Sequence, residues 1–397
     1  MSTALDGAVV LDATGAFWAS LGAALLADFG AQVIRLDELT RARARAADGD
    51  SSAWNYDDEL ANRNKLSIAA DWRAARGRRI LEQLIAKADV FVTDAAASDL
   101  QEQRLDYGTL AALKPDLVYA RGSGFGPKGP DRDLPALDEL AAARTGMMPI
   151  LPQPGQPPVY TGSGQMYSTV MLAFGVVTAL WHREQTGEGQ EVDVSLFAGN
   201  MYGASLDIQA FLAMGGERFL HPVSRLDAGN PMSGTLYPTQ DRRWVTLTMP
   251  DTDRWWPGLA DIVGLDVRDA RFDSHEKRCE TNRLLLIELL EQAFQQWPAA
   301  HWRDAFAERQ LSADVIEDYS YPAQDPQALR NRYIVELEHP SAGRVKTLGF
   351  PVFMSDTPAR LRRTAPWVGQ HSAEVLSDLL GYSEDEIVEL QAEGVVA

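Results

Sequence analysis

The stretch from residue 156 to residue 196 constrains the fold of this chain more than any other. Pro158 holds its start extended, because a residue that precedes proline is pushed out of the helical region. Apolar side chains at 166–181 then recur at helical spacing, and Gly187 follows as a helix-ending residue. Residues 191–196 alternate with a period of two, as a half-buried strand does. A helix that leads directly into a strand predicts an α/β fold.

A second unit of this kind lies at the start of the chain. Residues 8–12 form an apolar run typical of a buried strand, residues 32–36 form another, and a helical pattern lies between them. Two strands joined through a helix predict a parallel crossover. The turn after the first strand lacks the G-x-G-x-x-G pattern of a dinucleotide site, so we expect no dinucleotide cofactor.

Length and element order together predict two domains. A chain of 397 residues exceeds the usual size of a single domain. We expect a Rossmann-like large domain with a parallel sheet, built from residues 1–205 and completed by residues 326–397. A linker at 206–224 leads into a smaller α+β domain at 225–325. The fold class is therefore α/β with a second, smaller domain.

Charge and cysteine content limit the partners and the compartment. The net charge of −19 argues against nucleic acid and against anionic membranes as partners, because both need a basic protein surface. The apolar run at 166–181 is shorter than the ~20 residues of a membrane helix. Cys279 is the single cysteine, so no internal disulfide can form, and we expect a cytoplasmic protein. The six histidines do not pair at a metal-binding spacing, so we expect no metal site.

Residues 179–196 carry a more specific signature. They read A-L-x-x-R-x-x-T-G-x-G-Q-x-V-D-V-S-L, and Gly164 precedes the helix. This pattern resembles that of the family III CoA-transferases, a superfamily with formyl-CoA and carnitine CoA-transferases and acyl-CoA racemases. The resemblance extends from LADFGAQVI at 26–34 to A-P-x-x-G-x-H at 365–371. It implies transfer of CoA from an acyl-CoA thioester, the substrate, to a carboxylic acid, without a bound cofactor, in an interlocked dimer.

The resemblance also implies a covalent mechanism, and here the chain departs from the family. In the family an aspartate follows the glycine at the start of the helix and acts as the nucleophile, whereas the corresponding residue here is Gln165. A carboxylate is an anion whose anhydride is a good leaving group, but an amide is neutral and its nitrogen lone pair is delocalised. We therefore expect that this chain alone lacks the catalytic nucleophile.

The CoA-binding positions of the family can be carried over in the same way. They correspond here to two arginines, a lysine and two glycine-bearing loops, namely Arg35, Arg41, Lys65, Gly124, Phe125, Gly126, Gly229 and Asn230. A second departure follows the strand at 88–92. The family has a loop there with an arginine, an aromatic residue and a glycine, whereas this chain reads TDAAAS at 93–98. We expect Asp94 to face the place of the CoA phosphates.

Three interpretations follow. In the first, the chain is the non-catalytic subunit of a hetero-oligomer, paired with a homologous chain that carries the aspartate, in the manner of family members that resemble benzylsuccinate CoA-transferase. In the second, it is an active homodimeric transferase that uses another carboxylate, Asp138 or Glu139. In the third, it binds or regulates CoA esters, or acts on them without a covalent aspartate. A racemase is disfavoured, because Leu137 stands where the racemases have a histidine. The altered loop at 93–98 favours the first interpretation, because the missing nucleophile and the missing CoA-binding loop both concern catalysis on CoA.

Overall fold

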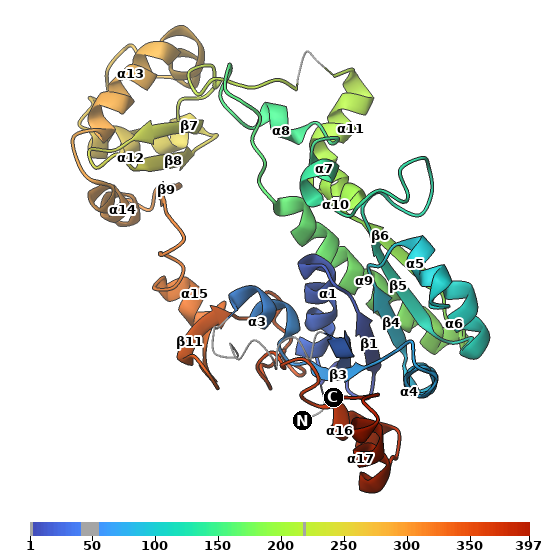
Figure 1. Cartoon of the computed structure of the whole chain (residues 1–397). Coiled ribbons are helices and arrows are strands. Elements are labelled where there is room, and N and C mark those ends of the chain that lie inside the picture. The colour runs from blue at the N-terminus through green and yellow to red at the C-terminus, as the bar shows by residue number, and fades with distance from the viewer. Residues whose placement is uncertain (1–2, 41–54, 217–219) are drawn as a thin grey trace. The chain divides into compact units, whose positions relative to one another are not determined.

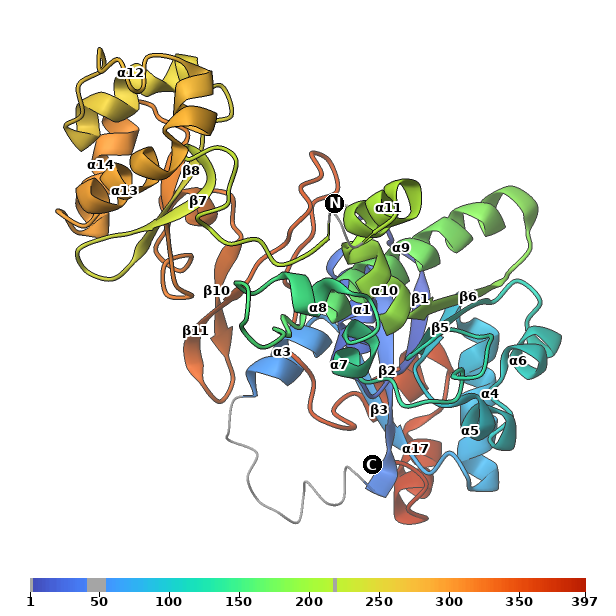
Figure 2. The same cartoon turned by 90° about the horizontal axis from the view of Figure 1, so that it is seen from above.

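A computed structural model of the chain describes residues 3–40, 55–216 and 220–397. Arg41, an expected CoA contact, lies outside the described residues. The chain divides into two compact units (Figures 1 and 2). Unit 1 comprises Met1–Met148, Tyr160–Met214 and Asp325–Ala397, and unit 2 comprises Pro149–Val159 and Gly215–Gln324. Unit 2 therefore contains most of the predicted small domain and adds a short segment from before the long helix.

Unit 1 is built on a sheet of six parallel strands. These are β1 (Val9–Ala13), β2 (Gln32–Glu38), β3 (Leu66–Ala70), β4 (Val90–Thr93), β5 (Val118–Ser123) and β6 (Glu191–Ser195). Their order is β3-β2-β1-β4-β5-β6, and every neighbouring pair is parallel. This is the order of the doubly wound fold, in which the direction of winding reverses between β1 and β4. The prediction of an α/β fold with a Rossmann-like parallel sheet is confirmed.

Helices cover both faces of this sheet (Figure 1). On one face α1 (Phe17–Asp28) packs against α9 (Ser163–Thr186), and the other face carries α4 (Ala75–Lys87) and α6 (Tyr107–Leu113). The other described helices of unit 1 are α3 (Tyr56–Asn62), α5 (Ala97–Glu102), α7 (Asp138–Ala142), α10 (Leu196–Gly203), α11 (Ser205–Met214), α15 (Pro326–Arg330), α16 (Ser372–Glu374), a π-helical turn (Val375–Leu379) and α17 (Glu384–Ala392). A short helix, α8 (Met147–Ile150), lies at the sequence boundary between the units.

Alternating side chains along the strands divide the core of unit 1 into two layers. Leu11, Ile34 and Phe91 belong to the layer with α4, whereas Val10 and Val33 belong to the layer with α1. All five are at most 1% exposed. Burying each such side chain stabilises the fold by about 1.5–3 kcal/mol. Because the alternation has a period of two, a register slip of one residue would exchange the layers, so the pattern fixes the pairing of the strands.

The helix α9 has 24 residues and is longer than its apolar pattern predicts. It begins after Gly162 and ends at Gly187, both in the left-handed conformation that glycine adopts without a steric penalty. By length and composition α9 could cross a membrane, so the expectation that this segment is too short is wrong. A core helix can have the same length and composition, and 33% of the apolar stretch of α9 is buried.

Unit 2 is a small α+β body. Its antiparallel sheet has the order β7-β8-β9, with β7 (Ser233–Pro238), β8 (Trp244–Thr248) and β9 (Ala313–Ile316). Around it lie α12 (Thr252–Val263), a π-helical turn (Lys277–Thr281), α13 (Arg283–Phe294) and α14 (Ala299–Glu308). Aromatic rings fill its core. The ring centroid of Phe294 lies 4.8 Å from that of Trp302, edge to face, and 5.2 Å from that of Tyr237, in a tilted pair. Such pairs add stability beyond the area that they bury.

The last part of the chain returns to unit 1 through a hairpin of β10 (Ile334–His339) and β11 (Gly343–Leu348). The carboxylate of Asp28, at the end of α1, holds this part in place. It accepts hydrogen bonds of 2.7 Å from Arg63 Nη2 and of 2.7 Å from Asn64 Nδ2. Arg63 also donates to the backbone carbonyls of Leu348, the last residue of β11, and of Gly349, which follows it.

This ion pair is buried, since Asp28 is 1% and Arg63 2% exposed. Burial raises the pKa of Asp28 above its ordinary value, and the charge of Arg63 opposes that rise. The backbone oxygen of Asp28 also accepts from the backbone N–H of Arg360 at 3.0 Å. One residue at the end of α1 therefore connects the sheet layer to two separate parts of the C-terminal segment.

We expect the change Asp28→Asn to destabilise the chain by about 3–5 kcal/mol, because it leaves the buried Arg63 without a counter-charge. Urea denaturation followed by circular dichroism measures this loss. Arg76→Gln, which breaks an ion pair with Glu389 at the surface, is the control and should shift the midpoint far less. Equal shifts in both variants would contradict the role given to Asp28.

Candidate functional site

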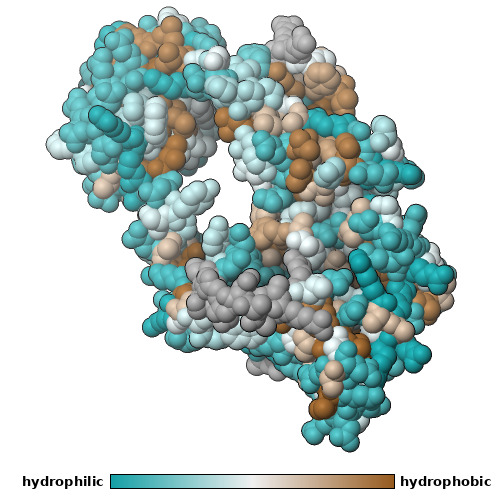
Figure 3. All heavy atoms as spheres, in the orientation of Figure 1, coloured by the Kyte–Doolittle hydropathy of each residue, from teal (hydrophilic) through white to brown (hydrophobic). Residues whose placement is uncertain are grey.

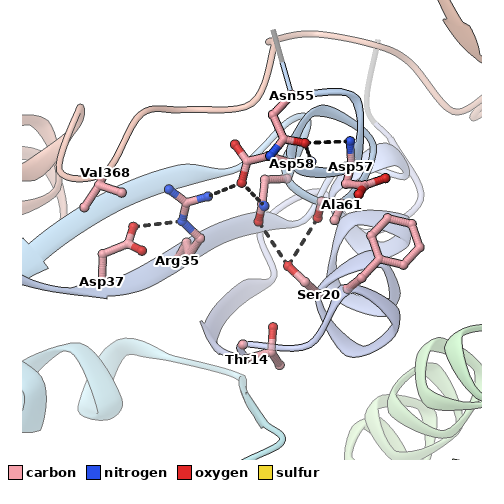
Figure 4. A pocket seen from close by; sticks show the side chains of 12 residues that line it. Thr14, Ser20, Arg35, Asp37, Asn55, Asp57, Asp58, Ala61 and Val368 are labelled. Atoms are coloured by element: carbon pink, nitrogen blue, oxygen red, sulfur yellow. Dashed lines mark hydrogen bonds and ion pairs between the residues drawn. The ribbon is translucent and has the colours of Figure 1, made fainter. Parts of the chain in front are cut away.

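A cavity of about 400 Å³ opens at the carboxyl ends of β1 and β2 (Figure 4). Doubly wound proteins bind their ligands at this edge of the sheet. Its walls come from the first part of α1 and the turn before it, from β2, from α3 and from one residue of the C-terminal segment. The lining residues are Thr14, Gly15, Phe17, Ser20, Arg35, Asp37, Asn55, Asp57, Asp58, Ala61, Asn62 and Val368. The cavity therefore includes Arg35, one of the expected CoA contacts.

The charge of Arg35 is already balanced within the protein. Figure 4 shows its guanidinium between two aspartates, with Nε 2.8 Å from Asp37 and Nη1 3.4 Å from Asp58. Its Nη2 donates to the carbonyl of Pro366 at 3.2 Å. With Asp57, the described lining carries three aspartates and one arginine. A phosphate in this cavity would meet an excess of negative charge from these residues, which disfavours Arg35 as a phosphate contact.

Lys65 does not line this cavity, although the sequence predicts it as a phosphate contact. Its side chain is fully buried, and its ammonium donates to Asp12 Oδ2 at 2.6 Å and to Asn62 Oδ1 at 3.0 Å. It also donates to the carbonyl and the hydroxyl of Ser20, both at 2.8 Å. Burial lowers the pKa of Lys65 and the Asp12 carboxylate raises it. The ammonium holds α1, β1 and the start of β3 together and has no donor left for a ligand.

Asp94, in the altered loop after β4, occupies the N-terminal end of α1. Its carboxylate accepts from the backbone N–H of Gly15 at 2.9 Å and from that of Ala16 at 2.6 Å. Such free amides at a helix start bind anions. Burial raises the pKa of Asp94, and the two amide hydrogen bonds oppose this. The side chain that the sequence places near the CoA phosphates therefore takes up an anion-binding helix end itself.

Gln165 lies in the first turn of α9, beside a hydrogen-bonded chain of three side chains. Tyr160 Oη donates to Asp138 Oδ2 at 2.7 Å, and Asn200 Nδ2 donates to Asp138 Oδ1 at 2.8 Å. A methyl group built on Gly162 would lie 3.8 Å from Tyr160 Oη and 3.9 Å from Gln165 Nε2. The phenol and the amide therefore flank one point, and Asp138 stands directly behind the phenol.

This cluster has no carboxylate at the start of α9. Gln165 is half-buried and neutral, whereas both oxygens of Asp138 accept hydrogen bonds, which stabilise its charge and lower its nucleophilicity. Glu139 is exposed. Partial burial, followed by the hydrogen bond to Asp138, raises the pKa of Tyr160, so the phenol keeps its proton at neutral pH. The cluster can orient a polar group, but it presents no free anionic nucleophile among these residues.

The remaining predicted residues fall into two groups. Gly124, Phe125 and Gly126 follow β5, and the ring of Phe125 packs 5.9 Å from that of Phe197 and under the guanidinium of Arg144. Gly229 and Asn230 belong to unit 2, where Asn230 accepts from the N–H of Met232 and donates to the carbonyl of Met249. Asn230 thus shapes its own turn.

Sequence reasoning missed Tyr160 and Asn200. Neither lies at a motif spacing from Asp138, which is 22 residues before Tyr160 and 62 residues before Asn200. Gly164 offers the one usable signal for Asn200, because a methyl group on this glycine would lie 2.0 Å from the Asn200 amide. A glycine inside a helix often marks such a close approach.

Comparison with known proteins gives matches along nearly the whole chain. The sequence profile of CoA-transferase family III matches residues 5–372. Cinnamoyl-CoA:phenyllactate CoA-transferase from Clostridium sporogenes is 28% identical over 97% of this chain and 95% of its own length. The succinyl-CoA–L-malate CoA-transferase beta subunit from Chloroflexus aurantiacus is 28% identical over 99% of this chain and 98% of its own.

Solved structures show the same fold. A CAIB/BAIF family protein from Brucella suis has a TM-score of 0.81 at 24% identity and covers 96% of this chain and 100% of its own. Rv3272 from M. tuberculosis has a TM-score of 0.77 at 23% identity, over 94% and 98%. The chain belongs to CoA-transferase family III, and its resemblance to that family is confirmed.

We expect Gly164→Ala to destabilise the chain by ~1–3 kcal/mol, because the new methyl group would displace Asn200 from Asp138. Denaturant unfolding measures the change. Gly15→Ala serves as the control, since the nearest atom to its new methyl group, Asp94 Oδ1, is 3.9 Å away. If Gly164→Ala were as stable as the control, the close packing of Asn200 on α9 would be refuted.

Proposed function

We propose that this chain is the non-catalytic subunit of a hetero-oligomeric CoA-transferase, which moves CoA between an acyl-CoA thioester and a carboxylic acid. One observation carries the proposal: Gln165 stands in the first turn of α9, where the resemblance to the family places the nucleophilic aspartate. A homologous chain with that aspartate is the expected partner. Its carboxylate would attack the donor thioester, which forms a mixed anhydride and releases the CoA thiolate. The thiolate would then attack the aspartyl carbonyl, which forms an enzyme thioester and releases the donor acid.

The charges around the cavity at β1 and β2 support the proposal. Arg35, Lys65 and the amides at the start of α1 are engaged by Asp37, Asp12 and Asp94 respectively. A chain relieved of the covalent step has no need of a free cation to hold the CoA phosphates beside it. The lost nucleophile and the engaged cations thus concern the same task.

An uncovered apolar face on unit 1 supports a protein partner. Large apolar side chains stand out along α9, among them Phe174 at 70% and Trp181 at 69% exposure. Further apolar side chains gather over α11, as Figure 3 shows, including Leu206 and Leu212. Apolar patches of this kind mark interaction surfaces. Two copies of this chain would bring together two net charges of −19 and still lack the aspartate, which favours a homologous chain.

The relatives are consistent with either arrangement. One of them is named as the beta subunit of a succinyl-CoA–L-malate CoA-transferase, and its name therefore describes one chain of a larger enzyme. Others, such as succinyl-CoA–D-citramalate CoA-transferase at 29% identity, carry no subunit in their names.

We expect the tagged chain, purified from its native host, to bring down a homologous chain in equal amount, identified by mass spectrometry. The partner should have an aspartate where this chain has Gln165. The chain expressed alone should show no CoA transfer. Recovery of self-dimers only, with transfer activity, would refute the proposal.

Substitutions in the reconstituted complex locate the nucleophile. We expect Gln165→Asn to leave kcat within about threefold, whereas replacing the partner's aspartate by asparagine should lower it by a factor on the order of 10³ or more. Asp138→Asn tests the alternative that Asp138 is the nucleophile. A loss of all turnover in that variant, with the fold intact, would favour the alternative over the proposal.

A further inference from the structure

A histidine side chain closes the turn between β10 and β11. His339 is the last residue of β10, and its Nδ1 accepts hydrogen bonds from the backbone N–H of Ser341 at 3.3 Å and of Ala342 at 3.1 Å. The hydroxyl of Ser341 lies 3.2 Å from the same nitrogen. Because a ring nitrogen that accepts hydrogen bonds carries no hydrogen, the neutral ring has its proton on Nε2.

The Nε2 atom of this ring faces a buried carboxylate. It lies 3.5 Å from Oε2 of Glu59, a residue of α3 that is 3% exposed. The same oxygen accepts from the backbone N–H of Ala365 at 3.0 Å. The other oxygen, Oε1, is buried and has no hydrogen-bond partner among the residues that the structure describes. The carboxylate can therefore interact more strongly with a charged imidazole than it does with a neutral one.

A second proton on the ring would remove the hydrogen bonds that close the turn. A charged imidazole donates from both nitrogens, so Nδ1–H would face two backbone N–H groups that also donate. The hydroxyl of Ser341 can rotate and accept, but a backbone N–H cannot. Ser341 and Ala342 are both exposed, so water can take over their N–H groups once the turn opens.

The carboxylate of Glu59 favours this second proton. Opposite charges at such a distance attract more strongly where burial lowers the local dielectric constant. Burial raises the pKa of Glu59, and a positive charge on His339 opposes that rise, so each charge stabilises the other. The two hydrogen bonds of the exposed turn each contribute little, and the ion pair outweighs them.

Other charged groups belong to the elements packed against this pair, namely Asp58, Arg63, Glu336, Glu338, Arg344 and Arg363. Asp58 and Arg63 act on the pKa of Glu59 in opposite directions. Side chains alternate along a strand, so Glu338 and its cross-strand neighbour Arg344 lie on the face of the hairpin opposite to the imidazole. Arg363 is paired with Glu374. None of these six groups takes the place of either partner.

We propose that His339 is a proton-driven latch of the turn between β10 and β11. The neutral ring accepts from two backbone N–H groups and keeps the turn closed. The ring that takes a proton from solvent at Nδ1 releases the turn and forms an ion pair with Glu59. Histidine changes its charge between pH 5 and pH 8, so the turn opens as the pH falls through this range. The latch does not depend on the proposed function.

Hydrogen–deuterium exchange of the full-length chain, read by mass spectrometry, tests the latch. The exchange of the Ser341 and Ala342 amides is measured at several values between pH 8 and pH 5, and each rate is corrected for the exchange rate of an unstructured peptide at that pH. We expect the protection of these amides to fall about tenfold or more toward pH 5, because both hydrogen bonds to Nδ1 are lost.

Three variants separate the two partners from the background. His339→Asn keeps an acceptor oxygen for the turn but does not titrate, so its protection should be the same at pH 8 and pH 5. Glu59→Gln still accepts from Ala365 but has no charge, so opening should require a lower pH. His182→Gln removes an exposed histidine from α9 and should open as the unchanged chain does.

The proposal is overturned if protection in the unchanged chain does not depend on pH, or if His339→Asn loses protection on acidification as the unchanged chain does. Opening of Glu59→Gln at the same or a higher pH refutes the part given to the ion pair. Unfolding midpoints at pH 8 verify that the variants fold. Should His339→Asn not fold, nuclear magnetic resonance of the unchanged chain with ¹⁵N-labelled histidine decides, because Nδ1 of His339 must gain its proton over the pH range in which protection is lost.

Discussion

The buried ion pair between Asp28 and Arg63 is the interaction on which the arrangement of unit 1 depends. Asp28 is the last residue of α1, and Arg63 lies shortly before β3. The two carbonyls to which Arg63 donates lie 285 and 286 residues further along the chain. Two buried charges are tolerated only where each is paired and hydrogen-bonded. Since the partners come from three distant segments, the pair forms only when all three are in place, and it thereby fixes where the C-terminal segment lies against the sheet.

The same principle governs the cavity at the carboxyl ends of β1 and β2. Lys65 is paired with Asp12, Arg35 with Asp37 and Asp58, and the start of α1 with Asp94. In each case a group that could hold an anionic ligand holds a carboxylate of the chain instead. These carboxylates cannot leave without exposing a buried cation or free amides, so the internal pairs compete directly with any phosphate. The charged groups around the cavity therefore stabilise the fold, and they are not free to bind a phosphate.

Much of the fold, but less of the site, could be predicted from the sequence. The strands at 8–12 and 32–36 and the helix–strand stretch ending at Leu196 are local patterns, and β1, β2, α9 and β6 follow them. The role of Lys65 could not be predicted, because its partner Asp12 lies 53 residues away and only the crossover of the sheet brings them together. The expectation for Arg35 failed to foresee Asp58 for the same reason. A local sequence pattern predicts where a strand lies, whereas the partner of a charged side chain depends on which strands the fold brings together.

The cluster at the start of α9 explains why an amide suits position 165 in this chain. Tyr160 Oη donates a hydrogen bond to Asp138 and lies near the same point as Gln165 Nε2. A carboxylate at 165 would add a negative charge beside this cluster, where it would repel the carboxylate of Asp138. With a neutral amide there, Asp138 keeps its two donors, Tyr160 and Asn200. Asn200 in turn packs against Gly164, so one side chain contacts the start of α9 and donates a hydrogen bond to α7. The amide is therefore compatible with a stable, ordered helix start.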